Sequence, residues 1–184
     1  MEFEIIETPR LKLRKLNQEV FDFVFNKYTD KDLQQFLALK SIEELTLEKE
    51  KFKLGFSTFN RTFVYFQLIE KSSDTILGWC GYHTYYFTHD RAEIGYTLFD
   101  DSYKGKGFMS EAMEIIIAYG FQEMNLHRIE AFVGKDNVPS LKLMSNFGFK
   151  QEGHLKEHYL KNGVYEDSLA FALLRSEFLL PRRL

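Results

Sequence analysis

Apolar and polar positions recur at two different periods along the chain, and the change of period marks the expected strands and helices. Residues 11–16 alternate apolar and basic side chains, which is typical of a strand with one buried face. Residues 17–28 and 41–59 instead space their apolar side chains at roughly helical intervals. The first third of the chain therefore predicts one strand followed by two helices.

Aromatic and β-branched residues dominate the middle of the chain. They run through 62–69, 76–87 and 92–99, and short polar breaks at 71–74 and 88–91 separate these segments. The pattern predicts three antiparallel strands in a meander.

The strongest helical pattern lies at 110–124, where apolar side chains occupy more than one face, so this helix should lie against the core. The remaining expected elements are, in chain order, a strand at 128–133, a helix at 138–147 and strands at 149–160 and 165–174.

These seven strands and four helices predict an α/β fold built on one mixed, mostly antiparallel sheet. The helix at 110–124 connects the strands at 92–99 and 128–133 as a crossover, and strands connected in this way are parallel. We find no linker-like segment and no internal repeat, so residues 1–184 are expected to form a single domain.

Composition narrows the possible partners. The 184 residues are 45% hydrophobic and 28% charged, and the net charge of −3 gives no electrostatic reason to expect binding to nucleic acid or to an anionic membrane. The N-terminal residues lack the layout of a signal peptide, and no apolar run approaches membrane-spanning length, so we expect a cytoplasmic protein. The single cysteine, Cys80, excludes an internal disulfide, and the five histidines lack metal-ligand spacing, so no metal is expected.

A glycine pair, Gly105 and Gly107, lies between a predicted strand and the apolar helix. Glycines at such a place let backbone N–H groups converge on an anion, and the helix N-terminus adds partial positive charge. The spacing does not fit a Walker A loop, and Ser110 stands where a dinucleotide fingerprint needs a third glycine. The segment is therefore a candidate phosphate cradle, with a simple turn as the alternative.

Further motifs surround this loop in a familiar order. The loop itself reads Ser102-Tyr-Lys-Gly105-Lys-Gly107, and the other motifs are Thr8-Pro-Arg-Leu11, Ala92-Glu-Ile-Gly-Tyr96, Gly107-Phe-Met-Ser-Glu111-Ala112, Asn137-x-x-Ser140, and Asn146-Phe-Gly-Phe149 followed by Glu152-Gly153. In these motifs residues 6–178 resemble the GNAT superfamily of acyl-CoA-dependent N-acetyltransferases, and within it the RimJ/RimL-like branch, which acetylates protein N-termini. Ser102 departs from the Gln or Arg that the family has there.

The resemblance implies a GNAT fold in which the parallel strands at 92–99 and 128–133 splay around acetyl-CoA. It implies that the pantetheine arm pairs with the main chain of Thr97, Leu98 and Phe99. The residues expected to hold the diphosphate are Lys104, Gly105, Lys106, Gly107, Phe108 and Met109. Asn137 would bond the pantetheine arm or act only as a helix cap, and Lys142 would reach an outer phosphate or remain a solvated lysine.

Acetyl transfer requires a neutral amine to attack the thioester carbonyl, so a base and a stabiliser of the leaving thiolate are sought. Glu93 is the first candidate base, because related enzymes place a glutamate on this strand. The alternatives are Glu130, Glu157 and His158. Many family members carry a tyrosine acid where this chain has Met144, which leaves the Ser140 hydroxyl as the candidate partner of the thiolate.

For two further residues, a structural role is favoured over a role in the reaction. His83 either faces the cleft or is a hydrogen-bonded structural histidine. Cys80 is expected to be a buried small hydrophobe, because direct transfer needs no acyl-enzyme.

The acceptor amine is less well specified. An α-amino group of pKa ~8 is roughly a tenth neutral at pH 7, whereas a lysine of pKa ~10.4 is neutral in well under one part in a thousand. Together with the RimJ/RimL resemblance, this favours the α-amino group of a protein or peptide. The alternatives are a small amine, such as a polyamine or antibiotic, in a closed pocket lined by Tyr82, Tyr85, Tyr86 and Phe87, and a catalytically silent acyl-CoA-binding module. Both a monomer and a homodimer fit the sequence.

Overall fold

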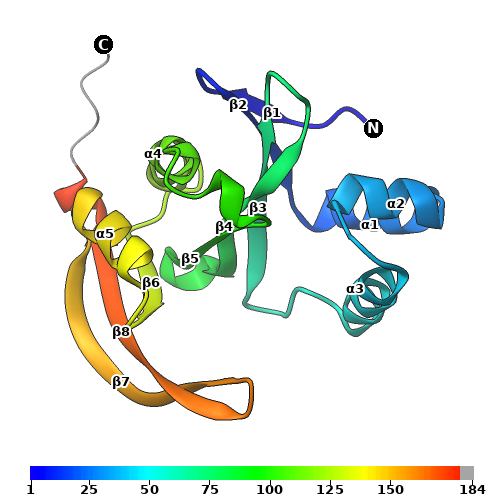
Figure 1. The fold of residues 1–184 in the computed structure, drawn as a ribbon. Helices are drawn as coiled ribbons and strands as arrows, with labels where there is room; N and C mark the ends of the chain where they lie inside the picture. Colours follow the sequence, from blue (N-terminus) through cyan, green and yellow to red (C-terminus); the bar gives the residue numbers. More distant parts are fainter. Residues whose placement is uncertain (179–184) are drawn as a thin grey trace.

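The computed structural model describes residues 1–178, which build one mixed eight-stranded sheet in the order β1-β2-β3-β4-β5-β6-β8-β7 (Figure 1). The strands are β1 (Ile5–Glu7), β2 (Leu11–Leu16), β3 (Thr62–Glu70), β4 (Ile76–Tyr86), β5 (Arg91–Leu98), β6 (Arg128–Gly134), β7 (Lys150–Lys161) and β8 (Val164–Leu174). The α-helices are α1 (Gln18–Lys27), α2 (Asp30–Leu37), α3 (Ile42–Leu54), α4 (Phe108–Gln122) and α5 (Val138–Asn146).

The predicted α/β class is confirmed, but two elements were missing from the prediction. Strand β1 has three residues, too few to show a period, and it pairs with β2. Helix α2 is capped at both ends, because the Thr29 side chain accepts from the Asp32 N–H and Ala38 adopts the left-handed conformation. The described residues therefore contain eight strands and five α-helices rather than seven and four.

Strands β5 and β6 are parallel, as the crossover through α4 requires, and every other pairing in the sheet is antiparallel. Their pairing covers only three positions, from Arg91 opposite Arg128 to Glu93 opposite Glu130. Beyond Glu93 the two strands separate while each keeps its antiparallel partner on the other side. The sheet is therefore split from Ile94 onward.

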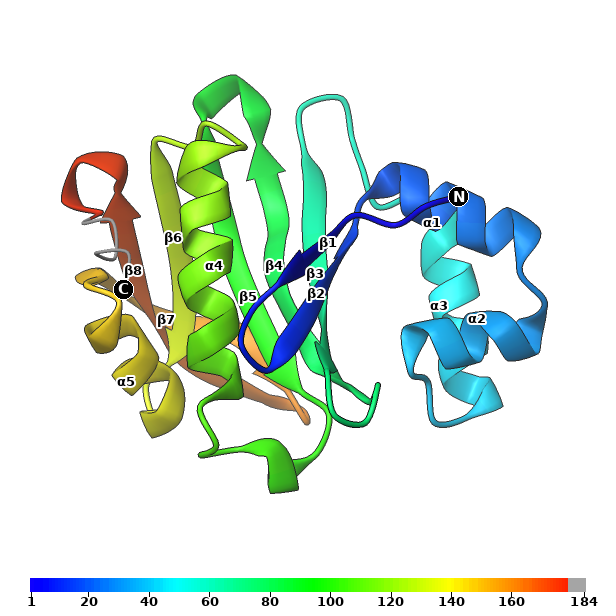
Figure 2. The same cartoon turned by 90° about the horizontal axis from the view of Figure 1, so that it is seen from above.

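The two faces of the sheet carry separate hydrophobic clusters (Figure 2). Helix α4 lies along one face, and its buried residues pack with Phe66 and Leu68 of β3. Helices α1 to α3 gather around Phe63 of the same strand in the second cluster. Because side chains alternate between the faces of a strand, β3 serves both clusters.

Helix α4 is held tightly to the sheet. Tyr82 of β4 is fully buried and its Oη donates a hydrogen bond to the Ile116 carbonyl at 2.8 Å.

Among the described residues, no helix is long and apolar enough to cross a membrane.

We expect Ile116→Ala to lower the free energy of unfolding by about 2–5 kcal/mol, because it deletes methylene and methyl groups from a fully buried position of α4. Glu114→Ala, at an exposed position of the same helix, is the matched control and should change stability by less than about 0.5 kcal/mol. Urea unfolding of both variants measures the difference. Equal stability of the two variants would contradict the packing described for α4.

Candidate active site

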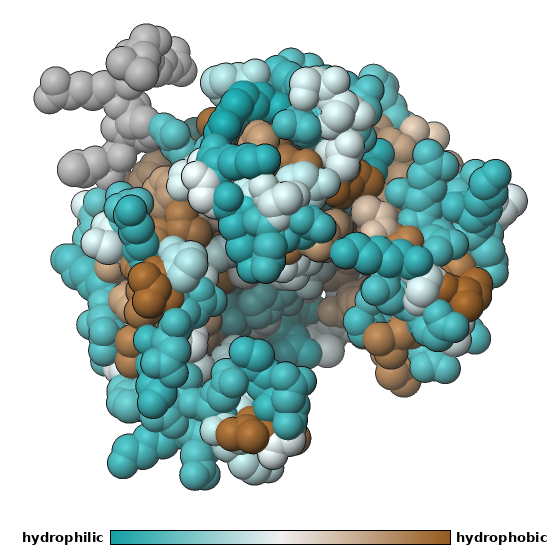
Figure 3. All heavy atoms as spheres, viewed as in Figure 1, coloured by the Kyte–Doolittle hydropathy of each residue, from teal (hydrophilic) through white to brown (hydrophobic). Residues whose placement is uncertain are grey.

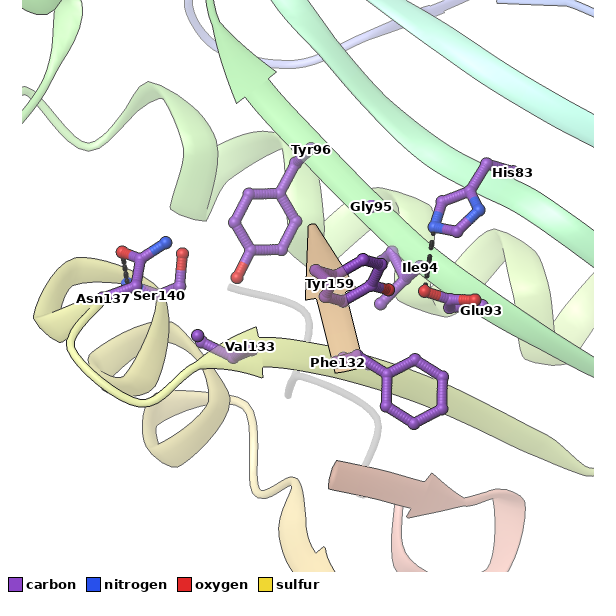
Figure 4. Close-up of a pocket in the computed structure, with 12 residues that line it drawn as sticks. His83, Glu93, Ile94, Gly95, Tyr96, Phe132, Val133, Asn137, Ser140 and Tyr159 are labelled. Atoms are coloured by element: carbon purple, nitrogen blue, oxygen red, sulfur yellow. Dashed lines mark hydrogen bonds and ion pairs between the residues drawn. The ribbon is translucent and has the colours of Figure 1, made fainter. Parts of the chain in front are cut away.

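The split between β5 and β6 opens a cleft with a volume of about 200 Å³ (Figure 4). Its walls are residues 93–96 of β5 and 131–134 of β6, and the remaining lining residues are His83, Asn137, Ser140 and Tyr159. Side chains from β4, the first turn of α5 and β7 therefore converge on the point where the sheet divides.

Glu93 and His83 form a pair in this cleft. The distance between His83 Nε2 and Glu93 Oε1 is 3.1 Å, and His83 Nδ1 lies 3.1 Å from the Thr84 hydroxyl. The glutamate side chain is 17% exposed, so it remains reachable from the cleft. When the Thr84 hydroxyl donates to Nδ1, the ring carries its hydrogen on Nε2 and donates it to Glu93.

A β-bulge produces this pairing. Tyr82 lies opposite Ile94 and Thr84 opposite Glu93, so His83 is the extra residue on β4. Gly95 makes room for the imidazole, because a Cβ at that position would lie 2.6 Å from His83 Cδ2. The cleft-facing alternative for His83 is thus the observed one.

The first turn of α5 forms the opposite end of the cleft. Asn137 is both the helix cap and a lining residue, since its Oδ1 accepts from the Ser140 N–H at 3.2 Å. The Ser140 hydroxyl also lines the cleft, beside Tyr96. Burial raises the pKa of Tyr96, and the nearby Ser140 lowers it by a smaller amount.

The glycine loop leaves a run of backbone donors unused. The N–H groups of residues 105–110 have no acceptor among the described residues, whereas the Lys104 N–H already donates to Asp101. Gly107 is the N-terminal cap of α4 with φ 81°, a conformation that favours glycine. These donors lie at a helix N-terminus, so the loop has the chemistry of a diphosphate site.

Residues from the N-terminal segment hold this loop in place. The Thr8 hydroxyl and the Arg10 N–H both donate to Glu111 Oε1, at 2.6 and 2.8 Å. Arg10 also pairs through Nε with Glu111 Oε2 at 2.7 Å and donates through Nη1 to the Lys106 carbonyl at 2.9 Å. Burial raises the pKa of Glu111, but the hydrogen bonds from Thr8 and Arg10 outweigh it, so the net pKa is lowered and the carboxylate stays ionised.

The three residues expected to pair with the pantetheine arm lie past the cleft. Residues 94–96 line it, whereas Thr97 and Leu98 end β5. Phe99 has both backbone groups engaged, because its N–H donates to Leu77 and its carbonyl accepts from Lys40. Because β5 pairs with β6 only as far as Glu93, its free edge runs from Ile94 to Leu98 and includes Thr97 and Leu98. Lys142 is exposed on α5.

The alternative bases differ in their surroundings. Glu130 accepts from Arg91 at 2.6 Å and from Arg128 at 2.7 Å, so both of its oxygens are occupied. Glu157 is exposed at φ 50°, and the His158 ring packs against Phe132. Glu93 alone among these carboxylates both lines the cleft and has a histidine partner.

Cys80, expected to be a buried small hydrophobe, lies in the core, and so does Met144, which stands where many family members carry a tyrosine. Cys80 and Met144 are fully buried, and burial raises the pKa of the cysteine thiol strongly. The aromatic side chains Tyr82, Tyr85, Tyr86 and Phe87 do not line the cleft: Tyr82 packs under α4 and the Tyr86 ring lies under the Arg91 guanidinium. Strand packing is therefore their main role. Among the described residues, no cluster of three His, Cys, Asp or Glu side chains is arranged to hold a metal ion.

The sequence did not reveal the His83–Glu93 pair, the Tyr96 hydroxyl or the contact of Arg10 with the glycine loop. Arg10 and Tyr96 both stand within the recognised motifs, which is the one signal that marked them.

We expect Arg10→Ala to weaken the binding of CoA roughly tenfold, because the variant removes the two side-chain donors that bind Glu111 and the Lys106 carbonyl of the loop. Lys12→Ala is the control, since Lys12 makes a comparable exposed ion pair with Asp74 away from the loop. Calorimetric titration with CoA measures both affinities. A CoA affinity in Arg10→Ala equal to that of the control would show that the loop does not depend on this contact.

Comparison with known proteins agrees with this geometry. The chain is 32% identical to the uncharacterized N-acetyltransferase p20 of Bacillus licheniformis over 95% of this chain and 98% of the relative. It is 26% identical to a spermidine N(1)-acetyltransferase of Vibrio cholerae serotype O1, over 92% and 96% of the two chains. The crystal structure of a GNAT-family acetyltransferase from Bacillus anthracis has a TM-score of 0.66 at 27% identity, covering 95% of this chain and all of that one.

A family model described as an acetyltransferase (GNAT) domain matches residues 10–150, which include the glycine loop, the first turn of α5 and every lining residue of the cleft except Tyr159. The chain therefore belongs to the GNAT family and is an acetyl-CoA-dependent N-acetyltransferase.

Proposed function

We propose that this chain moves the acetyl group of acetyl-CoA directly to a primary amine bound in the β5/β6 cleft, with Glu93 as the proton acceptor. The observation that carries the proposal is the His83–Glu93 pair at the point where the sheet divides. A carboxylate that pairs with a histidine in a partly buried cleft is held in one orientation, which is what a base for an amine needs.

Acetyl-CoA supplies the acetyl group and a thiol leaving group. The N–H groups of residues 105–109 would bind its diphosphate, and Lys106 would add positive potential. Lys142, which is exposed on α5, would reach an outer phosphate. The unpaired edge of β5 and the Asn137 side chain would hold the pantetheine arm. This placement sets the thioester between Glu93 and Ser140, the two ends of the cleft.

In this arrangement Glu93 takes a proton from the attacking amine, and His83 keeps the carboxylate turned toward the cleft. Ser140 contributes a hydroxyl at the end where the thiolate leaves. Glu130 serves as a structural partner of Arg91 and Arg128 instead of as the base.

We expect Glu93→Gln to lower kcat by about 10²–10⁴-fold while leaving the affinity for CoA unchanged, since the variant keeps the shape of the side chain and removes the base. Glu114→Gln on the exposed face of α4 is the control. Free-thiol release under saturating acetyl-CoA measures kcat, and calorimetry measures the affinity. Full turnover of Glu93→Gln would eliminate this carboxylate and direct attention to Glu157 or His158.

For the acceptor, we propose the α-amino group of a peptide or protein. The cleft lies beside a hollow of the surface between the hairpin of β7 and β8 and helix α3 (Figure 3). Tyr159 of that hairpin lines the cleft itself. An open hollow admits an extended chain end, and an α-amine requires less help from the base than a lysine does. This acceptor is also the one that the RimJ/RimL-like motifs favour.

A small polyamine is the second candidate. Carboxylates and aromatic rings lie together near the cleft: burial, together with the negative charges of Glu48 and Glu93, raises the pKa of Tyr65 to about 12. Such surroundings favour a cation. The likeness to a spermidine N(1)-acetyltransferase supports the same candidate.

We expect peptides with a free N-terminus to be acetylated at the α-amine, with kcat/KM rising toward pH ~8 and flattening above it. Mass spectrometry of matched peptides, one with a blocked N-terminus and one with blocked lysines, locates the acetyl group, and spermidine is assayed alongside. Acetylation that survives N-terminal blocking, or a kcat/KM far higher for spermidine, would overturn the proposed acceptor. CoA binding without thiol release for any amine would instead indicate a silent binding module.

A further inference from the structure

The Tyr96 hydroxyl is a buried polar group without a partner. The Tyr96 Oη and the Ser168 Oγ are the two buried side-chain oxygens that have no hydrogen bond within the described residues. An unsatisfied buried hydroxyl is destabilising, so the presence of the Tyr96 hydroxyl calls for an explanation.

The position of Tyr96 in the cleft supplies an explanation for its unpaired hydroxyl. The residue stands on β5 three positions after Glu93, where β5 has already separated from β6. Figure 4 shows the hydroxyl directed toward Asn137 and Ser140 at the start of α5, at the opposite end of the cleft from His83 and Glu93. Ser140 lies beside it without completing a hydrogen bond.

These two ends suit the two requirements of acetyl transfer. The amine must approach from the base, so the leaving sulfur lies on the side away from Glu93. A sulfur that gains the electron pair of the C–S bond needs a donor there, and the Tyr96 hydroxyl is a donor with no other acceptor. Met144, fully buried on α5, carries only a thioether and donates nothing.

We propose that Tyr96 is the catalytic acid that protonates the CoA sulfur, an inference that rests on the proposed transfer reaction. As the C–N bond forms and the C–S bond breaks, the C–S electron pair goes to sulfur and the Tyr96 Oη proton follows it. Glu93 takes the proton released by the amine. Water then returns a proton to Tyr96 and removes one from Glu93, so the products are an N-acetyl amide and free CoA thiol.

The raised pKa of the Tyr96 hydroxyl fits the role of an acid. Burial raises the pKa of Tyr96, with a smaller opposing effect from Ser140, so the proton is still in place at the pH at which amine acceptors become neutral. The Ser140 hydroxyl is close enough to stabilise the phenolate that forms when the proton leaves.

The test compares Tyr96→Phe, which keeps the ring and removes only the hydroxyl, with Tyr85→Phe. Tyr85 is also a partly buried tyrosine of the sheet, but it does not line the cleft. We expect Tyr96→Phe to melt at or above the wild-type temperature, because it removes an unsatisfied group, and to lower kcat by about 10²-fold or more. Tyr85→Phe should keep wild-type kcat.

A binding measurement separates contact with sulfur from a packing effect. Calorimetry with CoA and with desulfo-CoA, which lacks the thiol, should give a severalfold preference for CoA in the wild type and in Tyr85→Phe. In Tyr96→Phe the two affinities should become equal. Equal losses for both ligands in Tyr96→Phe would overturn the inference, and so would unchanged kcat.

The same experiments distinguish the two proposals. If the wild-type protein turns over and Tyr96→Phe has the same kcat, the role of Tyr96 is overturned and the proposed function stands. A wild-type protein that binds CoA but releases no thiol with any amine would overturn the proposed function, and with it the catalytic role of Tyr96.

Discussion

Strands β5 and β6 pair over three positions and then separate, and the rest of the site depends on this separation. Charged side chains hold the paired end together. Glu130 forms ion pairs with Arg91 and Arg128, and Arg128 also forms an ion pair with Glu152. The hydrogen bonds that Arg128 donates to Glu152 and Glu130 raise its pKa against the effect of burial. Each pair alone contributes little because it is partly exposed, but together they fix where the strands can part. Glu93, opposite Glu130 in the register, is the last paired residue before the opening.

The neighbouring elements place their side chains relative to this opening. The bulge in β4 directs His83 to Glu93, and Gly95 leaves the space that the imidazole occupies. On the other side, the crossover through α4 returns the chain to β6, and α5 then begins at the mouth of the cleft. The proposed base and the proposed partners of the thiolate consequently come from different elements that meet where β5 and β6 separate.

The site holds one of the two buried side-chain oxygens that lack a hydrogen bond in the described chain, the other being Ser168 Oγ. The loop keeps a run of N–H groups without acceptors, and Tyr96 keeps a hydroxyl without a partner. Elsewhere the buried polar side chains are mostly satisfied, as with Gln67, which donates to the Phe36 carbonyl. The buried Tyr96 hydroxyl is a cost to stability that a ligand bound there would offset, whereas the N–H groups of the exposed residues 105–107 are open to water or to a ligand. The tight packing of α4 and the Arg10–Glu111 contacts hold the loop in this state.

The sequence by itself determined the features that depend on local pattern or on chain connectivity. The apolar face of residues 110–124 predicted the buried helix α4, and a crossover helix between two strands can only join them in parallel. The glycine pair marked the loop because its backbone conformation requires glycine locally, as φ 81° at Gly107 shows. The short elements β1 and α2 were not predicted, because the three residues of β1 show no period and α2 is defined mainly by its caps.

Only the tertiary structure decided which side chains meet. Arg10 reaches Glu111 across 101 positions of the chain, a distance over which no local pattern carries information. The His83–Glu93 contact depends on one bulged residue, since a shift of register by one position turns a side chain to the other face of the sheet. The direction of the Tyr96 hydroxyl likewise follows from the separation of β5 and β6, and strand separation is a property of the assembled sheet that no single strand encodes.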